Sequence, residues 1–146
     1  MAMFLLKTEP GEFSYQDLHG RGRCAWDGVA NPAALGHIRA MRRGDLALIY
    51  HTADQKRVVG AARAVSDPYP DPAKPGVNSR GQIATPVIDL EPAGLAPEPL
   101  TLAAMKADAR FEGFVLLRQA RLSAMPVPAE LGRLILTLTG LSGVIG

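Results

Sequence analysis

The sequence is poor in cysteine and in aromatic residues. Cys24 is the single cysteine, Trp26 is the single tryptophan, and aromatic residues make up 5% of the 146 residues. A lone cysteine cannot form a disulfide within the chain, which fits a reducing compartment. With so few rings, the core must consist mainly of Leu, Val, Ile and Ala, so Trp26 stands out as a candidate for a specific role. The length and a hydrophobic fraction of 47% predict one globular domain over residues 1–146.

Long apolar runs and closely spaced metal ligands are also missing. No apolar stretch approaches the ~20 residues of a membrane span. The apolar run at residues 3–6 is too short for a signal peptide and has no basic segment before it. His19, His37 and His51 are too far apart along the chain for zinc-type spacing. The sequence therefore predicts a cytoplasmic protein with no membrane partner, no metal site and no cofactor.

Sequence motifs of common catalytic sites are scarce as well. No glycine-rich loop has the phosphate-binding pattern, and no serine lies in the context of a nucleophile elbow. Cys24 has no assigned basic partner that would activate its thiol. Nothing here requires an enzyme, so the sequence predicts no catalytic residue.

The charge balance permits a polyanionic partner without requiring one. Lys and Arg number 16 and Asp and Glu number 14, which gives a net charge of +2. Arg strongly outnumbers Lys, and its planar guanidinium suits phosphate. A genome rich in G and C favours Arg codons for unrelated reasons, so both explanations of the Arg excess stay open.

Hydrophobic patterning predicts an α+β fold with a small mixed or closed sheet of about five to six strands and short peripheral helices. Strands are expected at residues 3–6, 46–51, 56–66, 82–90 and 120–125, and helices at 14–18, 32–41, 101–107 and 129–138. The second and third strands should be antiparallel neighbours. Ser14 and Asn31 are the expected N-caps of the first two helices. The proline-dense segments 67–81 and 92–99 are expected to be loops, because proline donates no ladder hydrogen bond.

The stretch at residues 24–31 contains the parts of a pocket for a flat heterocycle. Trp26 offers a ring face for stacking, and Asp27 and Asn31 can hydrogen-bond the edge of a ring. Gly28 permits a sharp turn or a close backbone approach. Trp-Asp-Gly by itself is weak evidence, because a lone tryptophan more often belongs to the core. Asn31 also has a structural duty as a helix cap.

Seven segments, in order along nearly the whole chain, resemble the EVE domain family of the PUA-like superfamily, which is related in fold to YTH and ASCH domains. Trp26-Asp27-Gly28-Val29-Ala30-Asn31, for example, is similar to Trp-Asp-Gly-Val-Arg-Asn. The segments lie at residues 6–10, 13–18, 26–31, 44–51, 59–60, 64–72 and 116–123. The resemblance implies a PUA-like mixed β-barrel whose pocket holds a flipped modified base, notably modified cytosine in DNA. Flipping costs a few kcal/mol, which ~1–3 kcal/mol of stacking per base offsets in part.

The resemblance also implies roles for individual residues. The implied base pocket contains Trp26, Asp27, Asn31, Thr8, Tyr50, His51 and Ser123, and the implied contacts to the nucleic-acid backbone come from Lys7, Arg21, Arg23, Arg118 and Arg121. The sequence departs from the family in having no second tryptophan near Thr85. If that tryptophan closes an aromatic cage in relatives, the cage is thinner here.

The first hypothesis is thus a non-catalytic, base-flipping reader of modified bases in DNA. An RNA-binding or RNA-processing protein, with a ribonuclease or tRNA-modifying activity, is the second. Its candidate acid–base groups are Lys7, Asp27, Tyr50 and His51. The third is a protein–protein module. The chain is expected to be a monomer or a weak homodimer that associates through its apolar tail, residues 140–146.

Overall fold

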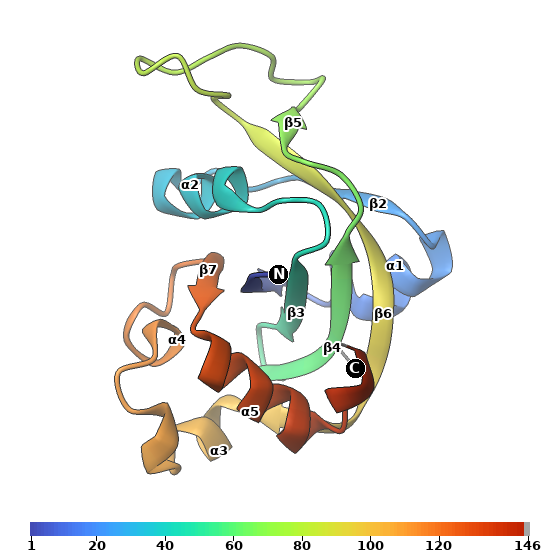
Figure 1. The fold of residues 1–146 in the computed structure, drawn as a ribbon, viewed down its shortest axis with the longest axis vertical. Helices are drawn as coiled ribbons and strands as arrows, with labels where there is room; N and C mark the ends of the chain where they lie inside the picture. Colours follow the sequence, from blue (N-terminus) through green and yellow to red (C-terminus); the bar gives the residue numbers. More distant parts are fainter. Residues whose placement is uncertain (145–146) are drawn as a thin grey trace.

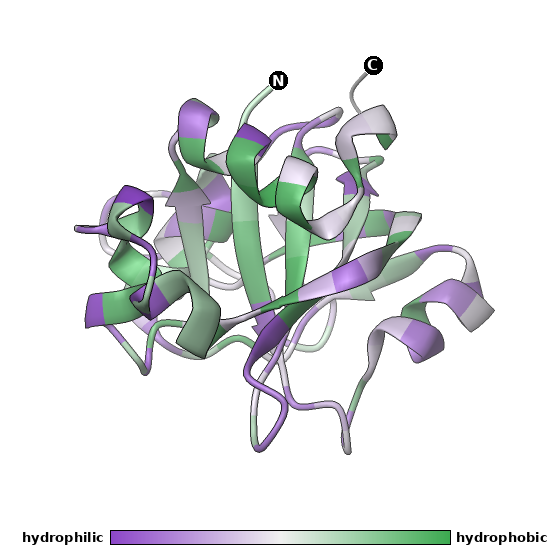
Figure 2. Cartoon of the chain, turned by 90° about the horizontal axis from the view of Figure 1, so that it is seen from below, coloured by the Kyte–Doolittle hydropathy of each residue, from purple (hydrophilic) through white to green (hydrophobic). Residues whose placement is uncertain are grey.

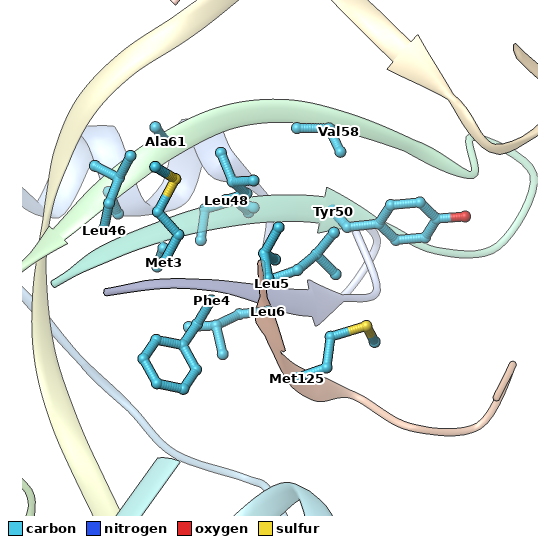
Figure 3. Close-up of a cluster of buried hydrophobic side chains, with 14 of the residues drawn as sticks. Met3, Phe4, Leu5, Leu6, Leu46, Leu48, Tyr50, Val58, Ala61 and Met125 are labelled. Carbon is cyan, nitrogen blue, oxygen red and sulfur yellow. The ribbon is translucent and has the colours of Figure 1, made fainter. Parts of the chain in front are cut away.

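Three buried strands form the centre of the sheet. In the computed structural model, which describes residues 1–144, β1 (Met3–Thr8) runs parallel to β3 (Leu46–His51). β4 (Arg57–Ala64) pairs with β3 in the antiparallel sense, as predicted. Every residue of β3 is buried, as expected for a continuous apolar run. Figure 3 shows the side chains of this region and of Met125 gathered in one apolar cluster.

The remaining strands extend this centre into a curled mixed sheet. β6 (Pro86–Thr101) pairs with β4, and β2 (Cys24–Trp26) and the two-residue β5 (Tyr69–Pro70) pair with β6. At the other end, β7 (Ala124–Val127) pairs with β1. The order is β2-β6-β4-β3-β1-β7, with β5 on β6. The sheet curls into a half-barrel with helices around it (Figure 1), which confirms the predicted fold class.

Two strand predictions were wrong in extent, and proline explains both. The segment 92–99 is not a loop but the second half of β6, which begins at Pro86 and not at residue 82. Beyond Leu90, no strand within residues 1–144 pairs with the side of β6 that faces away from β4. Proline is tolerated on such an edge. The last strand was expected at residues 120–125 and is β7 (Ala124–Val127). It can contain Pro126 because β7 is itself an edge strand.

The first two helices begin at the predicted caps. α1 (Tyr15–Arg21) has a capping box, in which Ser14 Oγ accepts the N–H of Asp17 at 3.1 Å and the Asp17 carboxylate accepts the N–H of Ser14 at 2.8 Å. α2 (Pro32–Ala40) begins after Asn31, whose Oδ1 accepts the N–H groups of the second and third helical residues at 2.9 and 3.1 Å.

Short helices complete the chain. They are α3 (Leu102–Lys106), the 3₁₀ turn η1 (Ala109–Phe111), α4 (Val115–Arg118), α5 (Ala129–Thr139) and the 3₁₀ turn η2 (Ser142–Val144). Figure 2 shows hydrophobic residues concentrated in the central strands and hydrophilic residues mostly in peripheral loops and helices. None of the helices within residues 1–144 has the length and apolar character needed to cross a bilayer. The tail packs on the fold through buried Leu141, and its last two residues, 145–146, lie outside the described residues.

Residues 71–85 form an arm that projects from the sheet between β5 and β6, at the top of Figure 1. Asn78 fixes its turn, because its Oδ1 accepts the N–H groups of Arg80 and Gln82 at 2.9 and 3.0 Å. From α2, the Arg39 guanidinium donates two hydrogen bonds, at 2.7 and 3.0 Å, to the carbonyl oxygen of Ile83. The proline-dense loop expected here is therefore an ordered arm anchored to a helix.

Candidate functional site

A cavity of about 630 Å³ opens where β1 and β2 end, a volume typical of small-ligand sites. We call it the Trp26 cavity. Three segments and one single residue, Ser123, contribute its wall. The segments are residues 7–9, 12–13 and 21–30 without residue 22. At Gly28 the chain turns with φ +76°, in the left-handed region that favours glycine, as the sequence predicted. Residues 27–30 line the cavity around this turn, and the chain then enters α2 at Pro32.

Two aromatic rings form the apolar part of the wall. Trp26 is 6% exposed. Its ring packs edge to face against the ring of Phe13, with centroids 5.9 Å apart and planes at 80°. The Arg21 guanidinium lies over the Phe13 ring, 5.1 Å from its centroid. Trp26 is thus both a core residue and a cavity residue. Sequence reasoning did not assign Phe13 to the site, although its position just before the Ser14 cap was a usable signal.

Lys7 and Thr8 fix the loops that surround the end of β1. Lys7 Nζ donates to the carbonyl oxygen of Ala120 at 2.9 Å, and its backbone N–H donates to the carbonyl oxygen of Ser123 at 2.8 Å. Thr8 Oγ1 donates to the carbonyl oxygen of Phe13 at 2.6 Å. Partial burial lowers the pKa of the Lys7 ammonium, because desolvation disfavours the charged form. The strand end therefore joins the two loops that carry Phe13 and Ser123.

The charged groups of the Trp26 cavity balance one another. Its wall contains three acidic residues and three basic residues: Glu9, Glu12, Asp27, Lys7, Arg21 and Arg23. A site of this kind offers hydrogen-bond donors and acceptors together, which suits a neutral polar ring better than an anion.

Arg23 is tied to the base of the arm through a carboxylate. Its guanidinium donates to Asp89 Oδ2 at 3.0 and 3.2 Å, and Tyr69 donates its hydroxyl to Asp89 Oδ1 at 2.6 Å. The hydrogen bond from Tyr69 and then the Arg23 contact lower the pKa of Asp89. The same hydrogen bond is the main reason that the pKa of Tyr69 is raised to about 12. The rim of the cavity and β5 thus share one polar cluster.

A second cavity of about 310 Å³ adjoins the first. We call it the Arg121 cavity, and it is lined by Asn31, Ala33, Gln119, Ala120, Arg121 and Leu122. The two cavities share a wall: residues 30 and 31 are consecutive, as are residues 122 and 123, and in each pair one residue lines each cavity. The hydrogen bond from Lys7 Nζ to the Ala120 carbonyl also joins the two sides.

A sequence model of the EVE domain matches residues 2–138. The chain belongs to the EVE domain family. Rat thymocyte nuclear protein 1 is 35% identical over 80 residues, which are 47% of this EVE domain chain and only 35% of the rat protein. The NMR structure of a Rhodopseudomonas palustris protein is 36% identical, with a TM-score of 0.85 over 97% of this chain and 94% of that one. Human THYN1 protein, crystallised in complex with 5-methylcytosine-containing DNA, shares the fold at 24% identity, with a TM-score of 0.84 over 95% of this chain and 98% of that one.

The structure of this EVE domain brings most of the predicted site residues together. Seven of the twelve line the Trp26 cavity: Trp26, Asp27, Thr8, Ser123, Lys7, Arg21 and Arg23. Asn31 and Arg121 line the neighbouring Arg121 cavity, and Arg118 is exposed and lines neither. Their contacts with a base or a phosphate stay predictions.

Tyr50 and His51 line neither cavity, because both side chains are buried in the EVE domain, each 3% exposed. His51 Nε2 accepts the backbone N–H of Tyr15 at 3.0 Å. Nδ1 lies 2.9 Å from Gln55 Oε1, so it carries the ring proton and donates it to that oxygen. The Tyr50 ring lies 5.8 Å from Lys7 Nζ. Both side chains thus lie inside the fold, where His51 contacts the start of α1 and Tyr50 lies beside Lys7 of β1.

Metal-binding side chains do not gather in this EVE domain. Within residues 1–144, no group of three or more His, Cys, Asp and Glu residues is placed to hold a metal ion. Cys24 lines the Trp26 cavity, where its Sγ accepts a long contact of 3.7 Å from the Arg21 guanidinium. The Trp26 cavity offers aromatic rings for stacking and charged and polar side chains for hydrogen bonding.

Proposed function

We propose that this EVE domain is a nucleic-acid-binding module that holds a flipped modified base, modified cytosine in DNA, in the Trp26 cavity without catalysing a reaction. The main support for this proposal is a cavity with the aromatic pair of Trp26 and Phe13 on its wall and equal numbers of acidic and basic groups. Human THYN1, which was crystallised with 5-methylcytosine-containing DNA, has the same fold and supports the proposal.

The polar groups of the cavity match the edge of cytosine. Cytosine presents an amino donor and carbonyl and ring-nitrogen acceptors. Asp27 is exposed and its carboxylate can only accept, so it is our choice for the amino group. Lys7 and Ser123 supply donors for the acceptors. Thymine and uracil present a carbonyl at the position of the amino group, which would face the Asp27 carboxylate without a proton between them.

The methyl group of a modified cytosine supplies a smaller part of the preference. Burying one methyl group against the apolar wall contributes about 0.8 kcal/mol, or about fourfold in Kd. We therefore expect modest selection for methylated over plain cytosine and stronger selection for cytosine over thymine. A base in a duplex must also be flipped at a cost of a few kcal/mol, so single strands should bind more tightly than duplexes.

The test is a fluorescence anisotropy titration of labelled single strands that differ in one central base. We expect 5-methylcytosine to bind most tightly, then cytosine, then thymine. Asp27→Asn should reduce the selection of cytosine over thymine, because the amide can donate to the thymine carbonyl. Asp54→Asn removes the same charge in an exposed turn outside both cavities and is the matched control. Equal, negligible binding of all strands would overturn the proposal.

RNA strands with the same central bases form the second arm of this titration. Tighter binding of RNA would replace DNA by RNA in the proposal and leave the base pocket in place. Incubation of the protein with transfer RNA tests the RNA-processing alternative. Of its four candidate acid–base groups, Lys7 and Asp27 line the Trp26 cavity, whereas Tyr50 and His51 lie outside it. Cleaved or modified RNA would contradict the non-catalytic part of the proposal.

A further inference from the structure

The arm at residues 71–85 is a two-stranded hairpin. Its root is closed by the N–H of Asp71, which donates to the carbonyl oxygen of Thr85 at 2.9 Å. Near the tip, the N–H of Asn78 donates to the carbonyl oxygen of Gln82 at 2.8 Å, with an antiparallel bridge next to this pair. Neighbouring strands lie about 5 Å apart. The arm is therefore a narrow ribbon that projects from the sheet (Figure 1).

The outer part of the arm carries exposed cations and an exposed apolar side chain. Lys74 and Arg80 are exposed, and neither side chain makes a hydrogen bond or an ion pair among the residues that the structure describes. Val77, which lies between them in the chain, is 67% exposed. The one carboxylate of the arm, that of Asp71, accepts the N–H of Ala73 at 2.9 Å. The arm thus presents positive charge and apolar surface together.

Positive charge is concentrated around the arm and α2. Residues 32–44 and 67–85 contain five Lys and Arg residues and two Asp residues, a surplus of three in a chain whose net charge is +2. Asp45, which follows the first of these segments, is buried. Arg39 joins the two segments through the Ile83 carbonyl. The charge surplus of the protein is therefore located here, whereas the charges of the Trp26 cavity balance.

The root of the arm lies close to Trp26 in the sheet. Trp26 pairs with Ile88, and Pro70, which precedes the arm, pairs with Pro86. Ile88 and Pro86 are two residues apart, which is about 7 Å along a strand. The Asp89 carboxylate also joins the rim of the Trp26 cavity to β5 through its two hydrogen-bond partners. The arm therefore rises from the part of β6 that pairs with the strand of Trp26.

We propose, on the basis of the proposed function, that the arm docks in the major groove of the duplex DNA that contains the flipped base. The major groove of B-DNA is about 12 Å wide and admits a two-stranded ribbon. Lys74 and Arg80 then contact phosphates at the edges of the groove, and Arg42 and Arg43, both exposed just after α2, add positive charge toward the backbone. These contacts offset part of the cost of flipping.

The shape of the groove makes this contact selective. The major groove of duplex RNA is too deep and narrow for side chains to read, and a single strand has no groove. An acidic protein would match the same charges, but the root of the arm adjoins the proposed base pocket, which favours DNA. We therefore expect the arm to act on duplex DNA and not on duplex RNA or single strands.

The test is an anisotropy titration of a DNA duplex with one central 5-methylcytosine and of the single strand that carries this base. Lys74→Gln together with Arg80→Gln removes both cations of the arm. Each phosphate contact on duplex DNA adds about 0.9 to the slope of log affinity against log salt. The double variant should therefore lower this slope by about 1.8 and weaken duplex binding by more than about tenfold at about 0.1 M salt. Binding of the single strand, and the change in Trp26 fluorescence that accompanies it, should stay as in the wild type.

Lys106→Gln together with Arg133→Gln is the matched control, because this exposed pair on α3 and α5 lines neither the Trp26 cavity nor the Arg121 cavity. It should leave the duplex slope unchanged. Wild-type affinity of the arm variant for the duplex, or an equal loss on the single strand or on duplex RNA, would overturn groove docking and leave the base pocket in place. If the wild type binds neither the duplex nor the single strand, the proposed function fails, and the role of the arm fails with it.

Discussion

The imidazole of His51 accepts the backbone N–H of Tyr15 across 3.0 Å. His51 ends β3, and Tyr15 is the first residue of α1, so this hydrogen bond joins the sheet to the helix that follows Phe13. Both side chains are buried. The contact fixes the position from which Phe13 and Arg21 reach the Trp26 cavity, which gives His51 a supporting role.

Replacing His51 should destabilise the fold. His51→Ala leaves the buried N–H of Tyr15 without an acceptor, which costs about 1–3 kcal/mol in the free energy of unfolding. Urea unfolding followed by circular dichroism measures this loss. His19→Ala is the control, because His19 is exposed and its loss should change stability by no more than about 0.5 kcal/mol. Equal stability of the two variants would contradict the supporting role.

Trp26 should report binding by its own fluorescence, since it is the single tryptophan.

Trp26→Ala is a poor binding test, because removal of a ring that is 6% exposed costs about 3–5 kcal/mol and endangers the fold. Trp26→Phe keeps an aromatic ring against Phe13 and is the better variant. We expect it to stay folded and to bind 5-methylcytosine strands more weakly, as measured by anisotropy. Unchanged affinity would place the base away from Trp26.

The hydrogen bond between Tyr69 and Asp89 should stabilise the protein over a defined pH range. The folded-state pKa of Tyr69 is raised from its ordinary value of 10.0 to about 12, so this stabilisation is complete below pH 10 and is lost as pH rises toward 12. The pKa of Asp89 is lowered from 3.8, so its stabilisation is complete above about pH 4 and is lost as pH falls through the lowered value.

Urea unfolding of the wild type and Tyr69→Phe across pH measures this effect. The difference in free energy of unfolding should be constant at neutral pH and should shrink at both extremes. Absorbance titration of the phenolate gives a second reading, because the difference between the two proteins isolates Tyr69. Asp89→Asn removes the negative charge and should lower the pKa of Tyr69 toward its ordinary value. A difference that does not vary with pH would refute the prediction.

Two glycines should respond to the same substitution with opposite signs. In Gly60→Ala, the new Cβ would lie 2.6 Å from Tyr15 Cε2 and 2.9 Å from the carbonyl oxygen of Gly94, so overpacking should cost about 1–3 kcal/mol. In Gly36→Ala, on α2, the nearest atom is Arg39 Nη1 at 3.9 Å. Higher helix propensity should then raise stability by up to about 1 kcal/mol. Melting temperatures compare the two, and a fall in both would show that the α2 position does not tolerate a methyl group.

Features set by neighbouring residues could be predicted from the sequence. The caps at Ser14 and Asn31 depend on a side chain and an N–H group two or three positions away. The turn at Gly28 and the pairing of β3 with β4 likewise follow from short stretches of chain. The cluster of Trp26, Asp27 and Ser123 was expected from a resemblance across the whole chain, since no local rule brings residue 123 to residue 26.

Features set by distant neighbours could not be predicted in this way. Whether proline is allowed in β6 depends on which side of that strand is paired, and only the strand order decides this. His51 was assigned to the pocket by the resemblance to the family. The direction of its side chain depends on Tyr15 and Gln55, and neither partner can be identified from the hydrophobic pattern.

The pairing of β1 with β7 has a consequence for how the protein is made. Lys7 and Ala120, which meet at the wall between the two cavities, are separated by 113 positions in the chain. Ribosomes deliver the N-terminal half first, so Met3–Thr8 must wait for Ala124–Val127 before this edge of the sheet is complete. Contacts of such long range form slowly. A nascent chain that ends before residue 120 lacks Ser123 of the cavity wall and the Ala120 carbonyl that accepts from Lys7 Nζ, so the Trp26 cavity is completed only near the end of synthesis.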